Sequence, residues 1–224
     1  MHMKSILFIS LLLLFWCNKS FSQQSRFEFG LHAGLNLNTA RGNAYTSPKP
    51  DNLLGVHFGF DVDYKLSERF KLKAMPQLDV NGWAFRSLLF EGIPPDTVMQ
   101  KGSAVTRLVY LNLPMTVNYS FGNKIEYDFG VGVFGGLLLD EKLIINQKIA
   151  PGVVIVRSFN DTDNYKRINF GLSISAGAKF PISERLKLNI GILNNLGLAN
   201  INRTGGSIKT NALSAILGVV LQPK

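Results

Sequence analysis

Between Val105 and Tyr119 the side chains alternate between apolar and polar character. Apart from Arg107, the odd positions of this stretch are apolar, and the even positions are mostly polar. Successive side chains of a β-strand point to opposite faces, so the pattern predicts a strand with one apolar and one hydrogen-bonding face. Strands of soluble domains are usually about 5–6 residues long. The 15 residues here are enough to cross a bilayer, which takes about 9–11 tilted strand residues.

The same alternation occurs in seven other segments, and no helical period of any length competes with it. The predicted connections are alternately long and short along the chain, with long loops at 40–52, 91–103, 141–166 and 200–210. The eight predicted strands are 27–38, 54–64, 70–80, 105–119, 127–139, 168–180, 186–192 and 213–221.

Three local irregularities are expected within this pattern. The alternation weakens near Gly82, which favours a β-bulge. Pro114 lacks an amide hydrogen, so a bulge or an unpaired site is expected opposite it. Inside the third long loop, Ile144-Ile145 and Val153–Val156 are apolar enough to extend the flanking strands beyond the membrane.

Amphipathic strands that enter hydrocarbon must close on themselves, because each unpaired backbone group there costs several kcal/mol. Even strand numbers, short periplasmic turns and long outer loops are typical of outer-membrane barrels. We therefore predict an all-β, eight-stranded antiparallel transmembrane β-barrel, up-and-down and closed, with both termini in the periplasm. Its own side chains should fill it and leave no open pore. Aromatic residues near the short turns predict a girdle at the membrane interface: Tyr64, Phe70, Tyr119, Tyr127, Phe129 and Phe180.

The amino terminus has the three-part layout of a secretory signal. A basic start at 1–4 precedes an apolar run at 5–17, and Ser20-Phe21-Ser22 places small residues at a cleavage site. We predict a signal peptide at 1–22 and a barrel domain at 23–224. Cys17 offers a lipid-attachment alternative, although bulky residues precede it. Cleavage after Ser22 removes the only cysteine, which excludes disulfides and thiolate metal sites.

The formal net charge of +9 falls to +7 once Lys4 and Lys19 are removed with the signal. For an exported chain, the anionic partners to expect are lipid phosphates at a membrane surface. A positive surface that only confers solubility is the alternative. We expect no nucleic-acid partner.

Two segments resemble the PorT-like outer-membrane β-barrel proteins of the Bacteroidota. Residues 110–119, YLNLPMTVNY, are similar to a characteristic strand of that family, and residues 29–36, FGLHAGLN, to its first strand. The resemblance covers the whole predicted barrel domain. Barrels of this type belong to Gram-negative bacteria. The resemblance implies a type of barrel and does not imply a particular reaction. Some members of the family are linked to protein secretion, so the resemblance also implies such a link here.

His32 and His57 are predicted to face the barrel interior close to one another and to Asp61. A histidine beside a carboxylate can act as a general base or a metal ligand. However, a charged interior must pair its charges in any case, and no nucleophile motif accompanies the histidines. We therefore assign no catalytic residue, no metal ligand, no cofactor and no defined binding residue. Instead we predict an interior polar network of Glu28, Asp61, Asp63, Lys71, Lys73, Asp79, Glu126, Asp128, Lys179 and Lys187.

Three functions remain open on this pattern. The first is a non-enzymatic, monomeric outer-membrane barrel that is surrounded by lipid and binds or scaffolds envelope or secretion proteins through its outer loops. The second is a lipid-modifying outer-membrane enzyme. The third is a soluble, lipocalin-like barrel, which would need an apolar interior and a polar exterior instead of the reverse.

Overall fold

The computed structural model describes residues 26–44, 49–90, 100–150, 153–160 and 164–223. The predicted signal peptide lies outside the described residues. The described chain is all β and forms one antiparallel sheet. Its strands are β1 (Phe27–Arg41), β2 (Leu53–Lys65), β3 (Phe70–Ala74), β4 (Gln77–Phe90), β5 (Gln100–Phe121), β6 (Glu126–Ala150), β7 (Val153–Phe159), β8 (Ile168–Pro181), β9 (Leu186–Gly197) and β10 (Lys209–Leu221).

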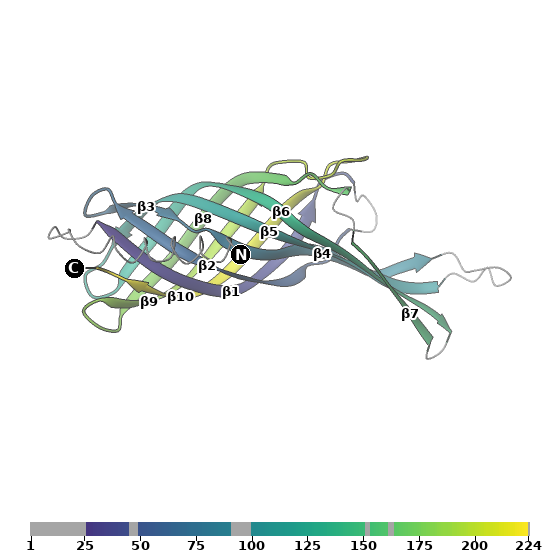
Figure 1. The fold of residues 1–224 in the computed structure, drawn as a ribbon, viewed down its shortest axis with the longest axis horizontal. Helices are drawn as coiled ribbons and strands as arrows, with labels where there is room; N and C mark the ends of the chain where they lie inside the picture. The colour runs from purple at the N-terminus through teal and green to yellow at the C-terminus, as the bar shows by residue number, and fades with distance from the viewer. Residues whose placement is uncertain (1–25, 45–48, 91–99, 151–152, 161–163, 224) are drawn as a thin grey trace, which may run out of the picture.

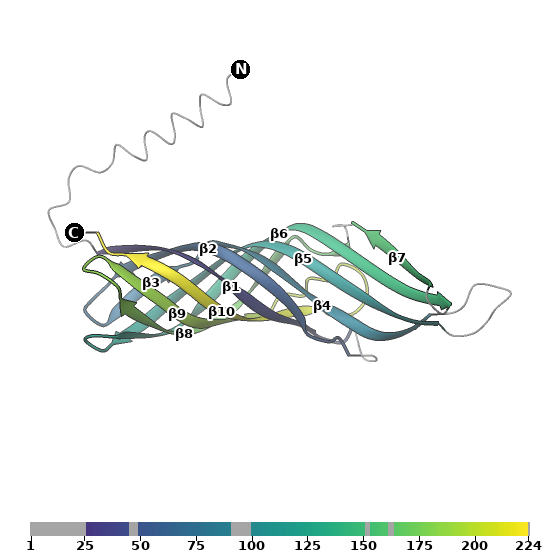
Figure 2. The ribbon, with the colours of Figure 1, turned by 90° about the horizontal axis from the view of Figure 1, so that it is seen from below.

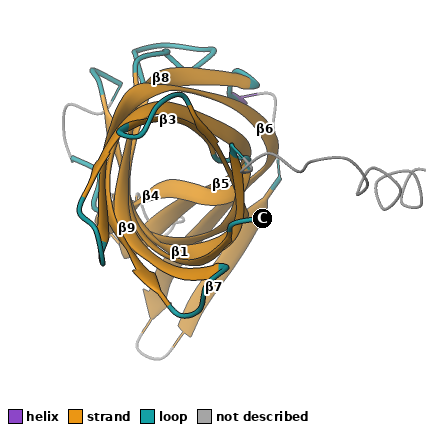
Figure 3. Ribbon diagram, turned by 90° about the vertical axis from the view of Figure 1, so that its left-hand side faces the viewer, coloured by secondary structure: helices purple, strands orange, loops and turns teal. Residues whose placement is uncertain are grey.

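The sheet closes into a barrel because β1 pairs with β10 as well as with β2. Going round the ring, the order is β1, β2, β3 with β4, β5, β6, β8, β9 and β10. Within the described residues these are eight barrel strands, since β3 and β4 lie end to end, and β7 pairs only with β6. Each ring neighbour is the next barrel strand in the chain, so the predicted up-and-down topology is confirmed (Figures 1 and 3).

The break between β3 and β4 has a local cause in two prolines. Ala74 pairs with Met115 and Gln77 with Asn112, so the register is the same on both sides of the break. Between these pairs, Pro76 and Pro114 have no amide hydrogen to donate, although the Met75 amide still donates to the Pro114 carbonyl at 2.9 Å. The site opposite Pro114 is therefore a break in the ladder that keeps this one hydrogen bond, and it is not a bulge.

The bulge expected near Gly82 lies a little further along the strand. The register between β4 and β5 runs without a shift through Gly82 and changes between Phe85 and Leu88. Gly82 is needed for a different reason: its φ is +147°, and a Cβ atom there would lie 2.0 Å from the Thr106 carbonyl oxygen. A second register shift lies between Val109 and Tyr110 on β5. On β6 the buried side chains are even-numbered up to Leu138, but beyond Leu139 the next buried side chain is the odd-numbered Glu141.

The barrel has an apolar outside and a polar inside, as the alternation predicts. On β5 and β6, Leu113 and Val131 are 41% and 65% exposed, whereas Asn112 and Thr116 are 2% and 1% exposed. Aromatic side chains near the short turns contact one another on the outside, among them Phe70 with Tyr119. This is the reverse of a lipocalin-like barrel. In the part of the chain that the structure describes, no helix is long and apolar enough to span a membrane.

The two ends of the barrel differ. The start of β1 and the end of β10 lie together, with Phe29 paired to Leu221, at the end that carries the short turns (Figure 2). At the other end, β4, β5, β6 and β7 continue beyond the ring as a sheet that projects from the barrel (Figure 1). Most of the predicted 141–166 loop is therefore strand: β6 runs on to Ala150 and turns back as β7.

Candidate functional site

A buried network of ion pairs occupies the barrel interior near the short turns. Its central anion is Glu28 on β1, which is fully buried and has four lysines around it. Lys179 lies 3.1 Å from the Glu28 carboxylate, Lys187 and Lys65 lie at 3.2 Å, and Lys71 lies at 3.6 Å. A buried charge is costly unless it is paired and hydrogen-bonded, and the barrel supplies these partners from strands on all sides.

The central cation of the same network is Lys179 on β8, which is also fully buried. Besides Glu28, its ammonium group contacts the carboxylates of Asp63 at 2.6 Å and Asp128 at 3.6 Å. Glu126 pairs with Lys71 and Lys187. Of the predicted network, every member except Asp79 has an ion-pair partner: Glu28, Asp61, Asp63, Lys71, Lys73, Glu126, Asp128, Lys179 and Lys187.

The two histidines lie further along the interior, next to each other. His32 and His57 are 1% and 3% exposed, and their ring centroids are 5.6 Å apart. The His32 Nδ1 atom lies 3.1 Å from an Asp61 carboxylate oxygen, and its Nε2 lies 3.0 Å from the Gln77 amide oxygen. The His57 Nδ1 atom lies 2.5 Å from the Asn36 amide oxygen. Sequence parity therefore placed both rings and Asp61 correctly.

Asp79 has amide partners instead of cations. The Gln77 side-chain nitrogen donates to both of its carboxylate oxygens at 2.9 and 3.0 Å, and Asn112 donates at 2.5 Å. Gln77 thus orients its amide nitrogen toward Asp79 and its amide oxygen toward His32. Because that oxygen can only accept, His32 Nε2 donates to it. This chain of contacts links Asp79 to the His32–Asp61 pair.

These contacts fix the orientation of the two rings. Among the described residues, the hydrogen-bond and ion-pair partners of the two histidines are Asp61, Gln77 and Asn36, none of which carries a hydroxyl or thiol nucleophile. The described residues also hold no group of three or more His, Cys, Asp or Glu side chains arranged for a metal ion. The arrangement can hold the strands that supply these interior side chains in one register.

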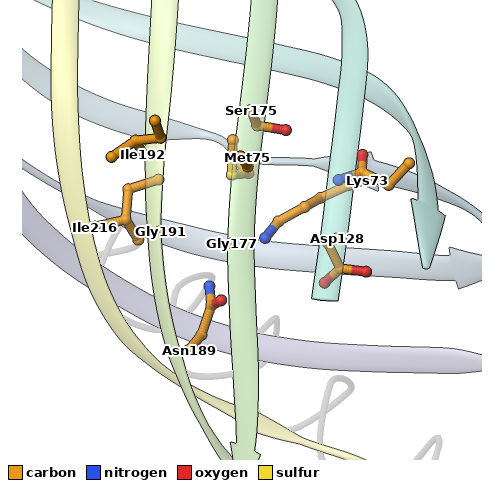
Figure 4. Close-up of a pocket in the computed structure, with 11 residues that line it drawn as sticks. Lys73, Met75, Asp128, Ser175, Gly177, Asn189, Gly191, Ile192 and Ile216 are labelled. Carbon is orange, nitrogen blue, oxygen red and sulfur yellow. The ribbon is translucent and has the colours of Figure 1, made fainter. Parts of the chain in front are cut away.

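A small cavity lies beside the network and is lined by residues of β3, β5, β6, β8, β9 and β10 (Figure 4). Its volume is about 20 Å³, which is room for about one water molecule. Lys73, Asp128 and Asn189 provide its polar walls, and Met75 and Ile216 its apolar ones. A cavity of this size can hold water but not a substrate or a cofactor.

The long-loop end of the interior contains an apolar cluster that the sequence pattern did not predict. Trp83 and Tyr165 meet edge to face with ring centroids 5.8 Å apart. Backbone hydrogen bonds tie the covering segments together, since the Ile201 amide donates to the Ile208 carbonyl at 2.9 Å. The only sequence signal for this cluster was the loss of alternation near Gly82. Its buried members are Ala40, Trp83, Leu108, Tyr110, Leu138, Tyr165, Ile201 and Ile208.

The projecting sheet exposes apolar side chains beyond the barrel. Val154 and Val156 on β7 are 50% and 63% exposed, and Leu89 on β4 is 61% exposed. In the described part of the sheet β7 pairs only with β6, so its other edge carries unpaired backbone groups. An edge of this kind can accept a strand from another chain.

Comparison with known proteins gives the same architecture. Residues 21–203 match the sequence profile described as the outer membrane protein beta-barrel domain. No curated protein matches the chain.

Similar solved structures are outer-membrane proteins at low sequence identity. Neisserial surface protein A is 11% identical, with 87% of this chain and 97% of that chain covered and a TM-score of 0.45. OprG from Pseudomonas aeruginosa is 9% identical, with 90% and 98% covered and a TM-score of 0.44. The outer membrane protease OmpT from Escherichia coli is 8% identical, with 92% and 99% covered and a TM-score of 0.45.

Proposed function

Because the chain belongs to the outer membrane protein beta-barrel domain family, we propose that it is a non-enzymatic barrel that holds a protein-binding sheet outside the membrane. The partner is an envelope or secretion protein, in line with the narrower resemblance to PorT-like barrels. The observation that carries this proposal is the projecting sheet of β4, β5, β6 and β7 with its exposed apolar side chains and its open β7 edge. Partners that add a strand to a sheet edge, or that bind through apolar side chains, recognise a surface of this type.

The rest of the barrel supports a holding role. The interior ion pairs join strands that are far apart in the sequence, and the apolar cluster of Trp83 and its neighbours fills the interior at the base of the projecting sheet. A rigid barrel keeps a recognition surface in a fixed orientation. The same packing supports the absence of an open pore and of a solvent-accessible active site at the buried histidines.

Two further parts of the proposal concern arrangement in the envelope. The short turns and both ends of the described chain face the periplasm, and the projecting sheet faces outward, as is usual for this type of barrel. The barrel acts as a monomer within the lipid. Cysteine placed at Thr204 in a long loop should react with an impermeant maleimide on intact cells, whereas cysteine at Asn123 in a short turn should not. The opposite labelling would reverse the orientation.

Site-specific photocrosslinking in living cells tests the binding role. A photoreactive phenylalanine at Val156 should give a discrete protein adduct, and the same residue at Leu217, which is 58% exposed on the membrane face, should not. The Val154→Asp change should remove the Val156 adduct, because it puts a charge on the same face of β7. An absence of any adduct at Val154, Val156 and Leu89 in cells that produce folded barrel would refute the proposal.

A further inference from the structure

On the outward face of the barrel, two pairs of basic residues lie directly opposite each other on neighbouring strands. Arg107 on β5 is in register with Lys142 on β6, and Arg41 on β1 is in register with Lys209 on β10. All four side chains are on the outward face of the barrel; three are exposed and Lys209 is half-buried. Like charges directly opposite each other in a sheet are destabilising. Two such pairs at the same end of the barrel indicate a bound anion that offsets the repulsion.

Both pairs lie just beyond the apolar band of the outer surface. Along β1 the exposed large apolar residues run from Phe27 to Leu37, and along β5 they run from Leu111 to Phe121. Each of these stretches takes ten steps of about 3.3 Å, which at a tilt near 40° gives a height of about 25 Å, the usual height of the lipid-facing band. Arg41 and Arg107 each stand four residues beyond the band. This is the level at which lipid headgroups begin.

The described part of the chain supplies no ion-pair partner for these cations. Within the described residues, none of the four forms an ion pair, and the Arg41 guanidinium makes one hydrogen bond, to the Gly197 carbonyl at 2.9 Å. Asp140 is exposed and lies two residues before Lys142 in the sequence, but it forms no ion pair with a described cation. The described interior acids, by contrast, nearly all have cationic partners. The outer cations are therefore available to an external anion.

The positions of the two pairs indicate what kind of anion this is. In the ring order, the β5–β6 boundary and the β10–β1 boundary are on opposite sides of the barrel. A single docked protein would cover one side, whereas the lipid layer surrounds the barrel at one height. Arginine and lysine bind phosphate oxygens through short, charge-assisted hydrogen bonds. We infer that Arg107 with Lys142, and Arg41 with Lys209, are two binding sites for the phosphate-bearing headgroups of membrane lipid in the leaflet at the long-loop end.

Native mass spectrometry of the purified full chain in neutral detergent tests this inference, with phosphatidic acid as the probe and phosphatidylcholine as the reference lipid. At about 1 kcal/mol for each basic residue near a lipid surface, the double change Arg107→Gln with Lys142→Gln should weaken phosphatidic acid binding about thirtyfold at that site. Arg41→Gln with Lys209→Gln should do the same at the other site. Phosphatidylcholine binding should not change.

The matched control is Lys148→Gln with Arg157→Gln, which removes two exposed cations from the projecting sheet at the same end of the molecule. This control should bind phosphatidic acid like the original chain. Gel mobility before and after boiling confirms folding, and if a double variant does not fold, Arg107→Gln alone should weaken binding about fivefold. Equal loss in the control, or no loss in the test variants, would overturn the inference. Displacement of the lipid by excess inorganic phosphate would overturn the assignment to lipid.

Discussion

Replacing Lys179 with methionine should be among the most damaging single changes in this barrel. Lys179 is fully buried, and its ammonium group is shared by Glu28, Asp63 and Asp128. After the change, Glu28 still has three lysines, and Asp128 still accepts a hydrogen bond from the Ser120 hydroxyl. Asp63 loses the only ion pair it makes among the described residues. Leaving one buried charge without its partner costs about 3–5 kcal/mol.

Urea unfolding in phospholipid vesicles measures this loss, with the folded fraction read from the mobility of unboiled samples on gels. The double variant Lys179→Met with Asp63→Asn should recover most of the lost free energy of unfolding, because it removes the stranded charge together with its partner. Lys124→Met, in an exposed short turn, should change the free energy of unfolding by less than about 0.5 kcal/mol. If Lys179→Met is as stable as Lys124→Met, or if Asp63→Asn gives no recovery, the interior network does not hold the strands as argued.

Three further predictions test the faces, the histidines and the apolar cluster. Leu113→Arg should lower the free energy of unfolding by about 2–4 kcal/mol, because it places a charge in lipid. Thr116→Ser should change the urea midpoint little, since it keeps the hydroxyl donor to Asn118. Equal stability of the two variants would mean that the faces are reversed. His57→Gln should lower stability by about 1–3 kcal/mol and leave the outer-membrane lipids unchanged by mass spectrometry, and a lipid species that depends on His57 would favour an enzyme. Trp83→Ala should cost about 3–5 kcal/mol in the same unfolding assay, and a neutral effect would show that the apolar cluster does not close the long-loop end.

The sequence by itself determined the eight barrel strands, their faces and most members of the interior network. It missed Lys65, which pairs with Glu28, and it included Asp79, which has amide partners. A strand has a side-chain period of two, and only a closed barrel satisfies the backbone in lipid, so alternation is enough to place Asn112 inside and Leu113 outside. The same parity put His32, His57 and Asp61 in one interior. It also anticipated that Ile144-Ile145 would lengthen a flanking strand, β6, whereas Val153–Val156 form the separate strand β7 instead of extending β8.

The tertiary structure decided which interior groups meet and how the long-loop end is closed. Lys179 reaches Glu28 across 151 positions of the chain, because strand tilt and closure, which parity does not encode, set the depth of each side chain in the barrel. For the same reason Asp79 meets the amides of Gln77 and Asn112 and not a lysine. Tyr165 and Ile201 lie outside the strands, so no periodicity marks them, and only the folding of the loops over the interior buries them beside Trp83.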